Sequence, residues 1–421
     1  MNQTDERVRR AVEAVWRIEA PRLIAGLARV LGDIGLAEDL AQDALVAALE
    51  QWPDEGVPRN PGAWLMTVGK RRAVDLIRRD QTYARKLELV GRTLDSDEPG
   101  PEPKAEAIED DLLRLVFTAC HPVLAPQARV ALTLRLLGGL STADIARAYL
   151  VAEATIAQRI VRAKRLLAQK RVPFEVPTGA QLAERLSSVL EVVYLIFNEG
   201  YSATAGDDWM RPALCEDALR LARVLSGLMP AEPEVHGLTA LLEIQASRVA
   251  ARATAQGSVV LLADQDRGRW NQLLIRRGFS ALAKADAAAK ARGEPPGPYA
   301  LQAAIAASHA RALTALDTDW NTIAGLYDAL IVLLPTPVVA LNRAVAVAQA
   351  RGPAAGLALV DEVAADDALK DYHLLPAVRA DLLSRLGRYD EARAELERAA
   401  PLARNRAERS LLVDRAAALP R

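Results

Sequence analysis

Apolar residues recur every three to four positions over three early stretches of the chain, residues 5–31, 36–51 and 61–80. This spacing gives each stretch one continuous apolar face and predicts three amphipathic helices. Helical periods return after residue 108 and continue to the end of the chain. Aromatic residues make up only 4% of the 421 residues, whereas Ala and Leu are abundant, which favours helices over sheets. We therefore predict an all-α fold.

Two breaks in the helical pattern divide the chain into blocks. Pro99, Pro101 and Pro103 forbid a regular helix within a stretch rich in Asp and Glu, and Pro173 and Pro177 mark the second break. The predicted organisation is a first helical domain over residues 1–92, a flexible acidic linker over 93–108, a second helical domain over 109–175, and a helical extension over 176–421.

The extension ends in a helical repeat. Residues 386–392, Leu-Gly-Arg-Tyr-Asp-Glu-Ala, have the turn and packing residues typical of a tetratricopeptide unit, and Leu396 and Ala399 follow at helical offsets. Small residues match one unit earlier, because Ala344 and Ala380 are 36 residues apart, as are Gly356 and Ala392. A looser third unit contains Ile323, Tyr327, Leu330 and Pro335. The alternative is an irregular helical bundle.

Residues 138–167 predict two short helices separated by a tight turn. Ser141 stands at an N-cap position and Asp144 follows three residues later, as in a capping box. From Glu153 the second helix is expected to bury Ile156, Ile160, Ala163 and Leu167 and to expose Thr155, Gln158, Arg159, Arg162 and Arg165. A bracing helix followed by a helix rich in donors is the helix-turn-helix design, which reads the major groove of DNA.

The charge of this segment supports DNA binding over an ordinary solvated basic face. Residues 141–171 hold seven cations against two acids, whereas the whole chain has a formal net charge of −1. Cations concentrated against a neutral background favour a surface that faces phosphates.

A second basic helix is predicted over residues 60–79. We expect it to bury Leu65, Val68, Ala73 and Leu76. Its like charges Lys70, Arg71, Arg72, Arg78 and Arg79 repel one another, and a bound polyanion would offset that repulsion. Trp64 could stack on an unpaired base or serve as an ordinary core tryptophan.

The helix predicted just before it, over residues 37–52, has an acidic first half. Leu40, Ala44, Ala47 and Ala48 are expected to pack inward. Its polar positions are Glu38, Asp39, Gln42 and Asp43. They are explained either by the helix dipole alone or by a face that docks on another protein.

Motifs of enzymes, cofactor sites and membrane spans are missing from the sequence. It has no phosphate-binding GxxxxGK[ST], no GxSxG and no HExxH, so we predict no catalytic residue, no metal site and no cofactor. No apolar run reaches 18 residues, and the charged N-terminus does not resemble a signal peptide, so we expect a cytoplasmic protein without membrane contact. Cys120 and Cys215 are expected to be buried free thiols.

Taken together, these segments resemble the extracytoplasmic-function (ECF) sigma factors. Residues 38–52 and 63–79 are similar to region 2 of that family, and residues 110–171, with FTACHP at 117–122, are similar to region 4. The long helical extension, with FNEGYSA at 197–203, resembles the subgroup that carries a tetratricopeptide-like C-terminal domain.

The resemblance implies two partners, promoter DNA and core RNA polymerase through its β′ clamp helices and β flap. It implies that Asp39, Gln42 and Asp43 bind polymerase; that Arg59, Asn60, Trp64, Lys70, Arg71, Arg72, Arg78 and Arg79 bind the −10 region; and that Thr155, Gln158, Arg159, Arg162 and Arg165 bind the −35 duplex. Many relatives have Asn where this chain has Arg71, which weakens any inference about the −10 sequence preference and leaves backbone binding intact.

Three readings of function and two of the extension stay open at this point. The principal function is a sigma factor regulated by its own C-terminal domain, and the alternatives are a stand-alone helix-turn-helix regulator with a tetratricopeptide-like sensory domain and a protein scaffold. The extension could fold back on the first two domains through a mixed surface of Arg248, Arg252, Arg267, Arg269, Asp264 and Asp266. It could instead bind a small ligand near Tyr194, Asn198, Glu199, Tyr201 and Trp209.

Overall fold

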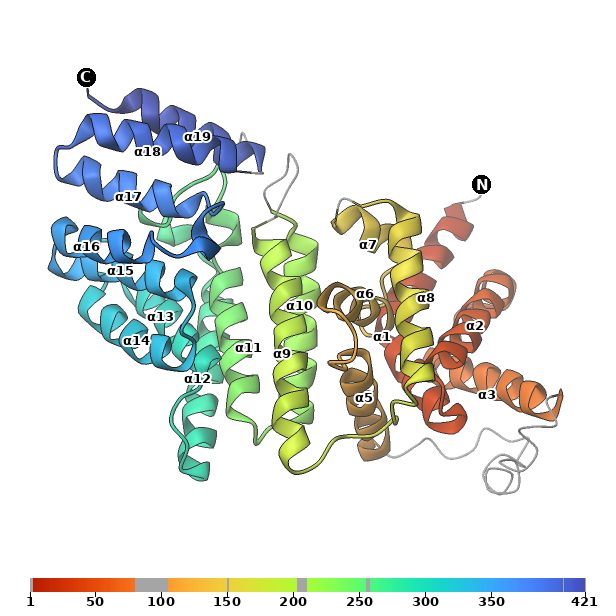
Figure 1. Cartoon of the computed structure of the whole chain (residues 1–421). Helices are drawn as coiled ribbons and strands as arrows, with labels where there is room; N and C mark the ends of the chain where they lie inside the picture. The colour runs from red at the N-terminus through yellow and green to blue at the C-terminus, as the bar shows by residue number, and fades with distance from the viewer. Residues whose placement is uncertain are drawn as a thin grey trace. The chain divides into compact units, whose positions relative to one another are not determined.

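The computed structural model describes residues 3–79, 105–149, 151–202, 210–254, 258–403 and 405–420 (Figure 1). Within these ranges every long element is a helix, and the only extended pairing is one isolated bridge between Ala253 and Val259. The all-α prediction is confirmed for this part of the chain. The described residues form two compact units, Met1–Leu195 and Ile196–Arg421. None of their helices is long and apolar enough to cross a membrane.

The first unit begins with three helices, α1 (Gln3–Leu31), α2 (Ile34–Glu55) and α3 (Pro61–Arg79). The bounds agree with the predicted helices to within a few residues. Asp33 starts α2, since its side chain accepts hydrogen bonds from the amides of Gly35 and Leu36 at 2.7 and 3.0 Å. Gly56 ends α2 with a φ of +83°, a conformation that favours glycine.

Four further helices complete the part of the first unit that precedes the second break. They are α5 (Ala105–Ala119), α6 (Pro126–Leu136), α7 (Thr142–Ala148) and α8 (Glu153–Gln169). Helix α5 includes the last four residues of the predicted linker, 105–108, and the rest of that linker, 93–104, lies outside the described residues.

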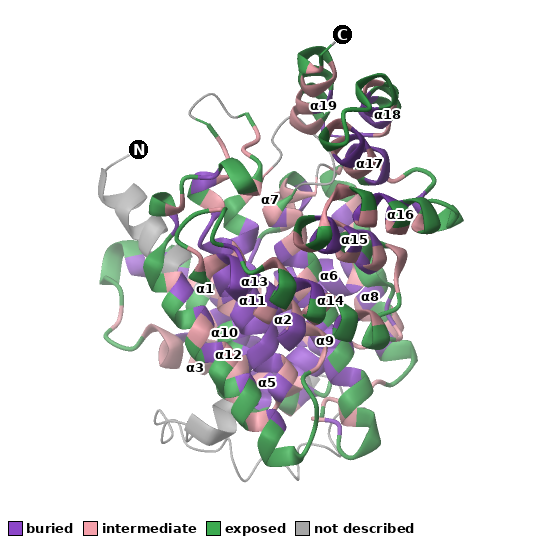
Figure 2. Ribbon diagram, turned by 90° about the vertical axis from the view of Figure 1, so that its left-hand side faces the viewer, coloured by how far each residue is buried: buried purple, intermediate pink, exposed green. Residues whose placement is uncertain are grey.

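Helix α9 (Ala180–Tyr201) belongs to both units, because the division between them falls after Leu195. The second unit then continues through ten α-helices among its described residues. They are α10 (Pro212–Leu228), α11 (Pro233–Ala246), α12 (Gln272–Arg292), α13 (Pro298–Arg311), α14 (Trp320–Leu333), α15 (Pro337–Arg351), α16 (Pro353–Val363), α17 (Leu374–Arg385), α18 (Tyr389–Leu402) and α19 (Arg406–Ala418). In Figure 2 the buried residues gather where neighbouring helices meet.

The last helices pack as pairs, as the repeat predicts. Gly387 makes the turn between α17 and α18 with a φ of +76°. Ala380, Ala392, Leu396 and Ala399 are buried in one apolar cluster with residues of α15 and α16. The looser unit has Ile323 and Leu330 in a neighbouring cluster, whereas Pro335 is exposed.

Gly356 shows how closely α15 and α16 approach. A Cβ atom at this position would lie 2.3 Å from the Cβ of Ala348 and 2.9 Å from the carbonyl oxygen of Ala344. We expect Gly356→Ala to lower the free energy of unfolding by about 1–3 kcal/mol, because a methyl group forces the two helices apart. Gly325→Ala in α14 is the matched control, since a Cβ there meets nothing within 4 Å. Urea unfolding checks the difference, and equal destabilisation by both variants would contradict this packing.

Cys120 and Cys215 are both buried and free, as predicted. Burial raises the pKa of the Cys120 thiol to about 11 and that of Cys215 to about 12. Since the thiolate is the reactive form, we expect neither to react with a thiol reagent at pH 8 within an hour, and both to react in guanidinium chloride. Rapid labelling of one thiol in the folded chain would contradict the burial described here.

One prediction about the extension is wrong. Arg248, expected on a mixed surface, is only 6% exposed and lies at the end of α11. Arg252 and Arg267 are half-buried, and only Arg269 is exposed as expected, together with Asp264 and Asp266. The reason is that the turns after α11 bring aromatic rings over the arginine side chains.

Candidate nucleic-acid interface

The helix-turn-helix forms from the residues that the sequence pattern indicates. Ser141 caps α7 by accepting a hydrogen bond from the Asp144 amide, and the Asp144 carboxylate accepts one in return from the Ser141 amide. Ile145 and Ala146 are buried on α7. On α8 the buried positions are Ile156, Ile160, Ala163 and Leu167. The predicted capping box and the four predicted buried positions of the second helix are confirmed.

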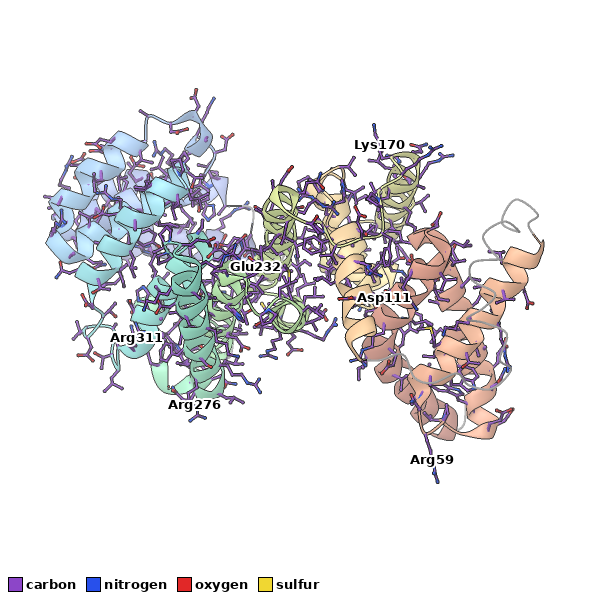
Figure 3. The ribbon with its side chains drawn as sticks, turned by 90° about the horizontal axis from the view of Figure 1, so that it is seen from below. Arg59, Asp111, Lys170, Glu232, Arg276 and Arg311 are labelled. Carbon is purple, nitrogen blue, oxygen red and sulfur yellow. The ribbon has the colours of Figure 1, made fainter. Side chains whose placement is uncertain are left out.

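The opposite side of α8 is the predicted cationic face. Gln158, Arg162 and Arg165 are exposed, and Thr155 and Arg159 are half-buried. Among the described residues, Arg159, Arg162 and Arg165 form no ion pair with a carboxylate. The guanidinium groups are therefore available to a polyanion. Lys170, at the C-cap of α8, extends from the C-terminal end of the helix (Figure 3).

Helix α3 carries the second cationic face. Arg71 is exposed, and Arg72 makes a 3.1 Å ion pair with Asp43 of α2 that stays open to solvent. Lys70 is half-buried, and this burial, together with the charge of Arg29, lowers the pKa of its ammonium group. The side chains of Arg78 and Arg79 at the end of α3 lie outside the described part of the structure.

The predicted buried side of α3 is correct in part. Leu65 and Ala73 are buried and Val68 is half-buried, but Leu76 is 37% exposed. Leu76 lies near the end of the helix, beyond the positions that pack closely on α1 and α2. The prediction for Leu76 is wrong because the helical period continues past the end of the contact.

Trp64 packs against another tryptophan. Its ring meets that of Trp52 edge to face at a centroid distance of 5.4 Å, and Trp52 is fully buried. Trp64 itself is half-buried, so part of its ring is accessible. Asn60 accepts a hydrogen bond from the Ala63 amide at 3.1 Å, which makes it a cap of α3. Arg59 is exposed and points away from the first unit (Figure 3).

The acidic face of α2 divides into exposed and buried carboxylates. Leu40, Ala44, Ala47 and Ala48 are buried, as predicted. Asp39 and Asp43 are exposed, and Gln42 is half-buried and donates a 2.7 Å hydrogen bond to Glu38. Glu38 is only 2% exposed. A buried carboxylate requires cationic partners.

Those partners come from the helix-turn-helix part of the same unit. The Nε of Arg135 in α6 donates to Oε1 of Glu38 at 2.6 Å, and the ammonium group of Lys164 in α8 pairs with Oε2. Lys164 also lies 3.5 Å from Asp39. A second ion pair links Arg29 of α1 to Asp111 of α5 at 3.0 Å. The sequence predicted none of these ion pairs. The one indication of a buried carboxylate was that Glu38 lies next to the buried stripe of α2.

The first part of α9 packs on α5 and α6. Arg185 donates a hydrogen bond to the carbonyl oxygen of Phe117 at 2.8 Å. The hydroxyl of Ser188 donates one to the carbonyl oxygen of Cys120 at 2.5 Å. Arg129 of α6 reaches Ser188 and, at 3.0 Å, Glu191. The FTACHP segment is therefore covered by the helix with which the extension begins.

Comparison with known families decides between the three functions left open by the sequence. Residues 16–83 match the family described as Sigma-70 region 2, and residues 114–167 match Sigma-70, region 4. The probable ECF RNA polymerase sigma factor SigI of Mycobacterium tuberculosis is 29% identical over 38% of this chain and 56% of its own length. The chain is an ECF sigma factor of the sigma-70 family.

One further relative supports the assignment, and another is similar over nearly the whole chain. The ECF RNA polymerase sigma factor SigL of Mycobacterium tuberculosis is 31% identical over 34% of this chain and 80% of its length. An uncharacterized protein of Rhizobium meliloti is 45% identical over 92% of this chain and 91% of its own length, so it shares the extension as well. Residues 185–286 of this ECF sigma factor match a family of unknown function, DUF6596. No solved structure matches the chain.

The family gives the general function of the chain. An ECF sigma factor acts in transcription initiation by binding core RNA polymerase and promoter DNA. Such factors are not catalytic, so the chain is not an enzyme. The structure places region 2 on α1, α2 and α3 and region 4 on α5 to α8.

Proposed function

We propose that each predicted binding residue has the role implied by its family position. The proposed −10 contacts are Arg59, Asn60, Trp64, Lys70, Arg71, Arg72, Arg78 and Arg79, and the proposed −35 contacts are Thr155, Gln158, Arg159, Arg162 and Arg165. The observation that carries this proposal is that Arg71, Arg162 and Arg165 are exposed without an ion pair among the described residues. The proposal includes a cytoplasmic location, since polymerase and chromosome are found there.

Polymerase binding is proposed for the exposed edge of α2. Asp39 and Asp43 present carboxylates to solvent there, with Gln42 between them. The Asp43–Arg72 pair is partly exposed on both sides and is worth about 1 kcal/mol or less, so it is easily exchanged for an intermolecular pair. The β′ clamp helices are the proposed partner of this edge, and the β flap is proposed for region 4.

Promoter binding requires the regions to separate in this proposal. Helices α3 and α8 both contact α2, which has 22 residues and is about 33 Å long, so their contact points on α2 are no further apart than that length. A spacer of roughly 17 base pairs separates the −10 and −35 elements by ~58 Å. Both faces reach one promoter only after the contacts of Glu38 with Arg135 and Lys164 are broken. The 25 residues between the end of α3 and the start of α5, 80–104, can span at most ~85 Å when fully extended, which allows this separation.

The extension is proposed to act on the sigma regions through α9. A chain ending at residue 175 lacks the ion pair of Arg129 with Glu191 and the hydrogen bonds that Arg185 and Ser188 donate to two carbonyl oxygens. We expect it to unfold in urea at a lower midpoint than a chain ending at residue 195, because these stabilising contacts are lost. Circular dichroism measures both midpoints, and equal values would show that α9 does not support region 4.

Transcription assays test the proposal as a whole. The full chain is mixed with core RNA polymerase on its own genomic DNA, and transcript 5′ ends are sequenced. We expect complex formation with core enzyme and new start sites that need both components. A stand-alone regulator would instead bind duplex DNA alone and leave start sites unchanged, and a scaffold would bind no DNA.

A further inference from the structure

Three arginines and two aromatic rings gather in the second unit, and we name Tyr201, Arg248, Arg252, Arg267 and Trp270 the arginine–aromatic cluster. The guanidinium carbon of Arg248 lies 6.0 Å from the ring centroid of Tyr201 and 5.7 Å from that of Trp270. Arg252 covers the Tyr201 ring at 3.4 Å, and Arg267 covers the Trp270 ring at 5.0 Å. Positive charge is therefore concentrated around two π faces.

Arg248 is the central side chain of this cluster. Arg248 is only 6% exposed, and its Nε has no hydrogen-bond partner. Among the described residues, no carboxylate forms an ion pair with Arg248 or Arg267. A buried cation without an anion is costly, and Arg129, which is 8% exposed, differs from Arg248 in making a 3.0 Å ion pair with Glu191.

Arg267, Trp270 and His309 add nitrogen atoms without hydrogen-bond partners around Arg248. Arg267 donates to the carbonyl oxygens of His309 and Ala312 at 2.6 and 2.8 Å, and its Nε is left without a partner. The indole nitrogen of Trp270 and Nδ1 of His309 are also buried without partners. Burial, then the charges of Arg248 and Arg267, lower the pKa of His309 to about 4, so its ring is neutral at pH 7.

We propose that the arginine–aromatic cluster binds a small oxyanion, a phosphate or carboxylate group, held by Arg248 and Arg267. An oxyanion supplies the acceptors and the negative charge that this cluster lacks, and arginine pairs with both groups through two parallel hydrogen bonds. Arg248, Arg267, Trp270 and Tyr201 all lie within the segment matched by DUF6596, residues 185–286. The extension would then sense a metabolite that carries such a group.

The proposal differs from the ligand cluster that the sequence suggested. Of that set, Tyr201 is retained, Glu199 is occupied by an ion pair with Arg211, and Trp209 lies outside the described residues. The binding groups named here were instead expected on a mixed surface. Their burial among unpaired donors is what points to an anion.

Thermal unfolding of the full chain tests this site. Inorganic phosphate and succinate are compared in separate titrations with sodium chloride at the same ionic strength. We expect one of the two oxyanions to raise the midpoint above the chloride value, and Arg248→Met to weaken its binding at least tenfold. Arg276→Met is the matched control, because Arg276 is exposed on α12 (Figure 3) and its loss should leave binding unchanged.

Two further measurements complete the test: the stability of Arg248→Met without oxyanion, and hydrogen exchange of the wild-type chain. Without oxyanion, Arg248→Met should unfold at the same midpoint as the wild type or higher, since it removes an uncompensated buried charge. Hydrogen exchange of the wild-type chain should slow at residues 243–254 and 262–272 when the binding oxyanion is present. No shift beyond chloride for either oxyanion, an equal shift in Arg248→Met, or unchanged exchange would overturn the proposal. Transcription is not used, so the result is independent of the proposed promoter contacts.

Discussion

Replacing Arg162 and Arg165 together with alanine is expected to lower transcription from the cognate promoter at least ~30-fold. Each arginine that reads a base edge contributes about 1–3 kcal/mol of recognition, and both side chains are exposed on the cationic face of α8. Because neither belongs to the buried side of the helix, stability should change by less than about 0.5 kcal/mol each. Run-off transcription with saturating core polymerase measures the loss.

A matched double variant separates recognition from overall charge. Arg276 and Arg277 are exposed neighbours on α12 of the second unit. Replacing both with alanine removes the same net charge far from α8 in sequence, and we expect at least half of the activity to remain. If the α8 variant kept that much activity as well, α8 would not be the helix that reads the −35 element.

Glu38→Ala is expected to increase, by ~100-fold or more, the population of molecules in which regions 2 and 4 are apart. Removing one partner of a buried ion pair costs about 3–5 kcal/mol, and here it leaves Arg135 and Lys164 without the carboxylate between them. The contact between regions is weakened, whereas the apolar core of each region is unchanged. Fluorescence energy transfer between labels on cysteines introduced at the exposed Gln51 and Gln169 reports the separation.

The native thiols do not interfere with this labelling, because Cys120 and Cys215 are buried. Glu50→Ala is the control, since Glu50 is exposed on the same helix and should leave transfer unchanged. In a double-mutant cycle, Lys164→Ala should add little once Glu38 is gone. Independent, additive effects of the two substitutions would mean that the pair does not hold the regions together.

The sequence predicted local structure well where a helix buries one continuous face. The buried residues of α8, Ile156, Ile160, Ala163 and Leu167, were predicted individually, because a 3.6-residue period fixes which side chains share a face. Leu76 was missed because a period continues past the residue at which packing ends. The capping box at Ser141 was predictable since both partners lie within four residues.

Contacts between distant residues were not predictable in the same way. Glu38 was expected on a solvated or docking face, and its partner Arg135 is 97 residues away in sequence. Arg248 was assigned to a surface because charged residues are rarely buried, and only the fold brings Tyr201 and Trp270 to it. Contacts between residues far apart in the chain depend on such side chains, and a single sequence contains no periodic signal that predicts these contacts.

The central claim is that two cationic faces of one chain occupy one promoter when core polymerase is present. Hydroxyl-radical footprinting combined with permanganate probing tests it most directly, on a promoter identified by the transcription assay. We predict protection at two elements about 17 base pairs apart and reactive, unpaired thymines at the −10 element, both only with core enzyme. The same footprint from the chain alone, or protection of a single element with polymerase present, would contradict the account.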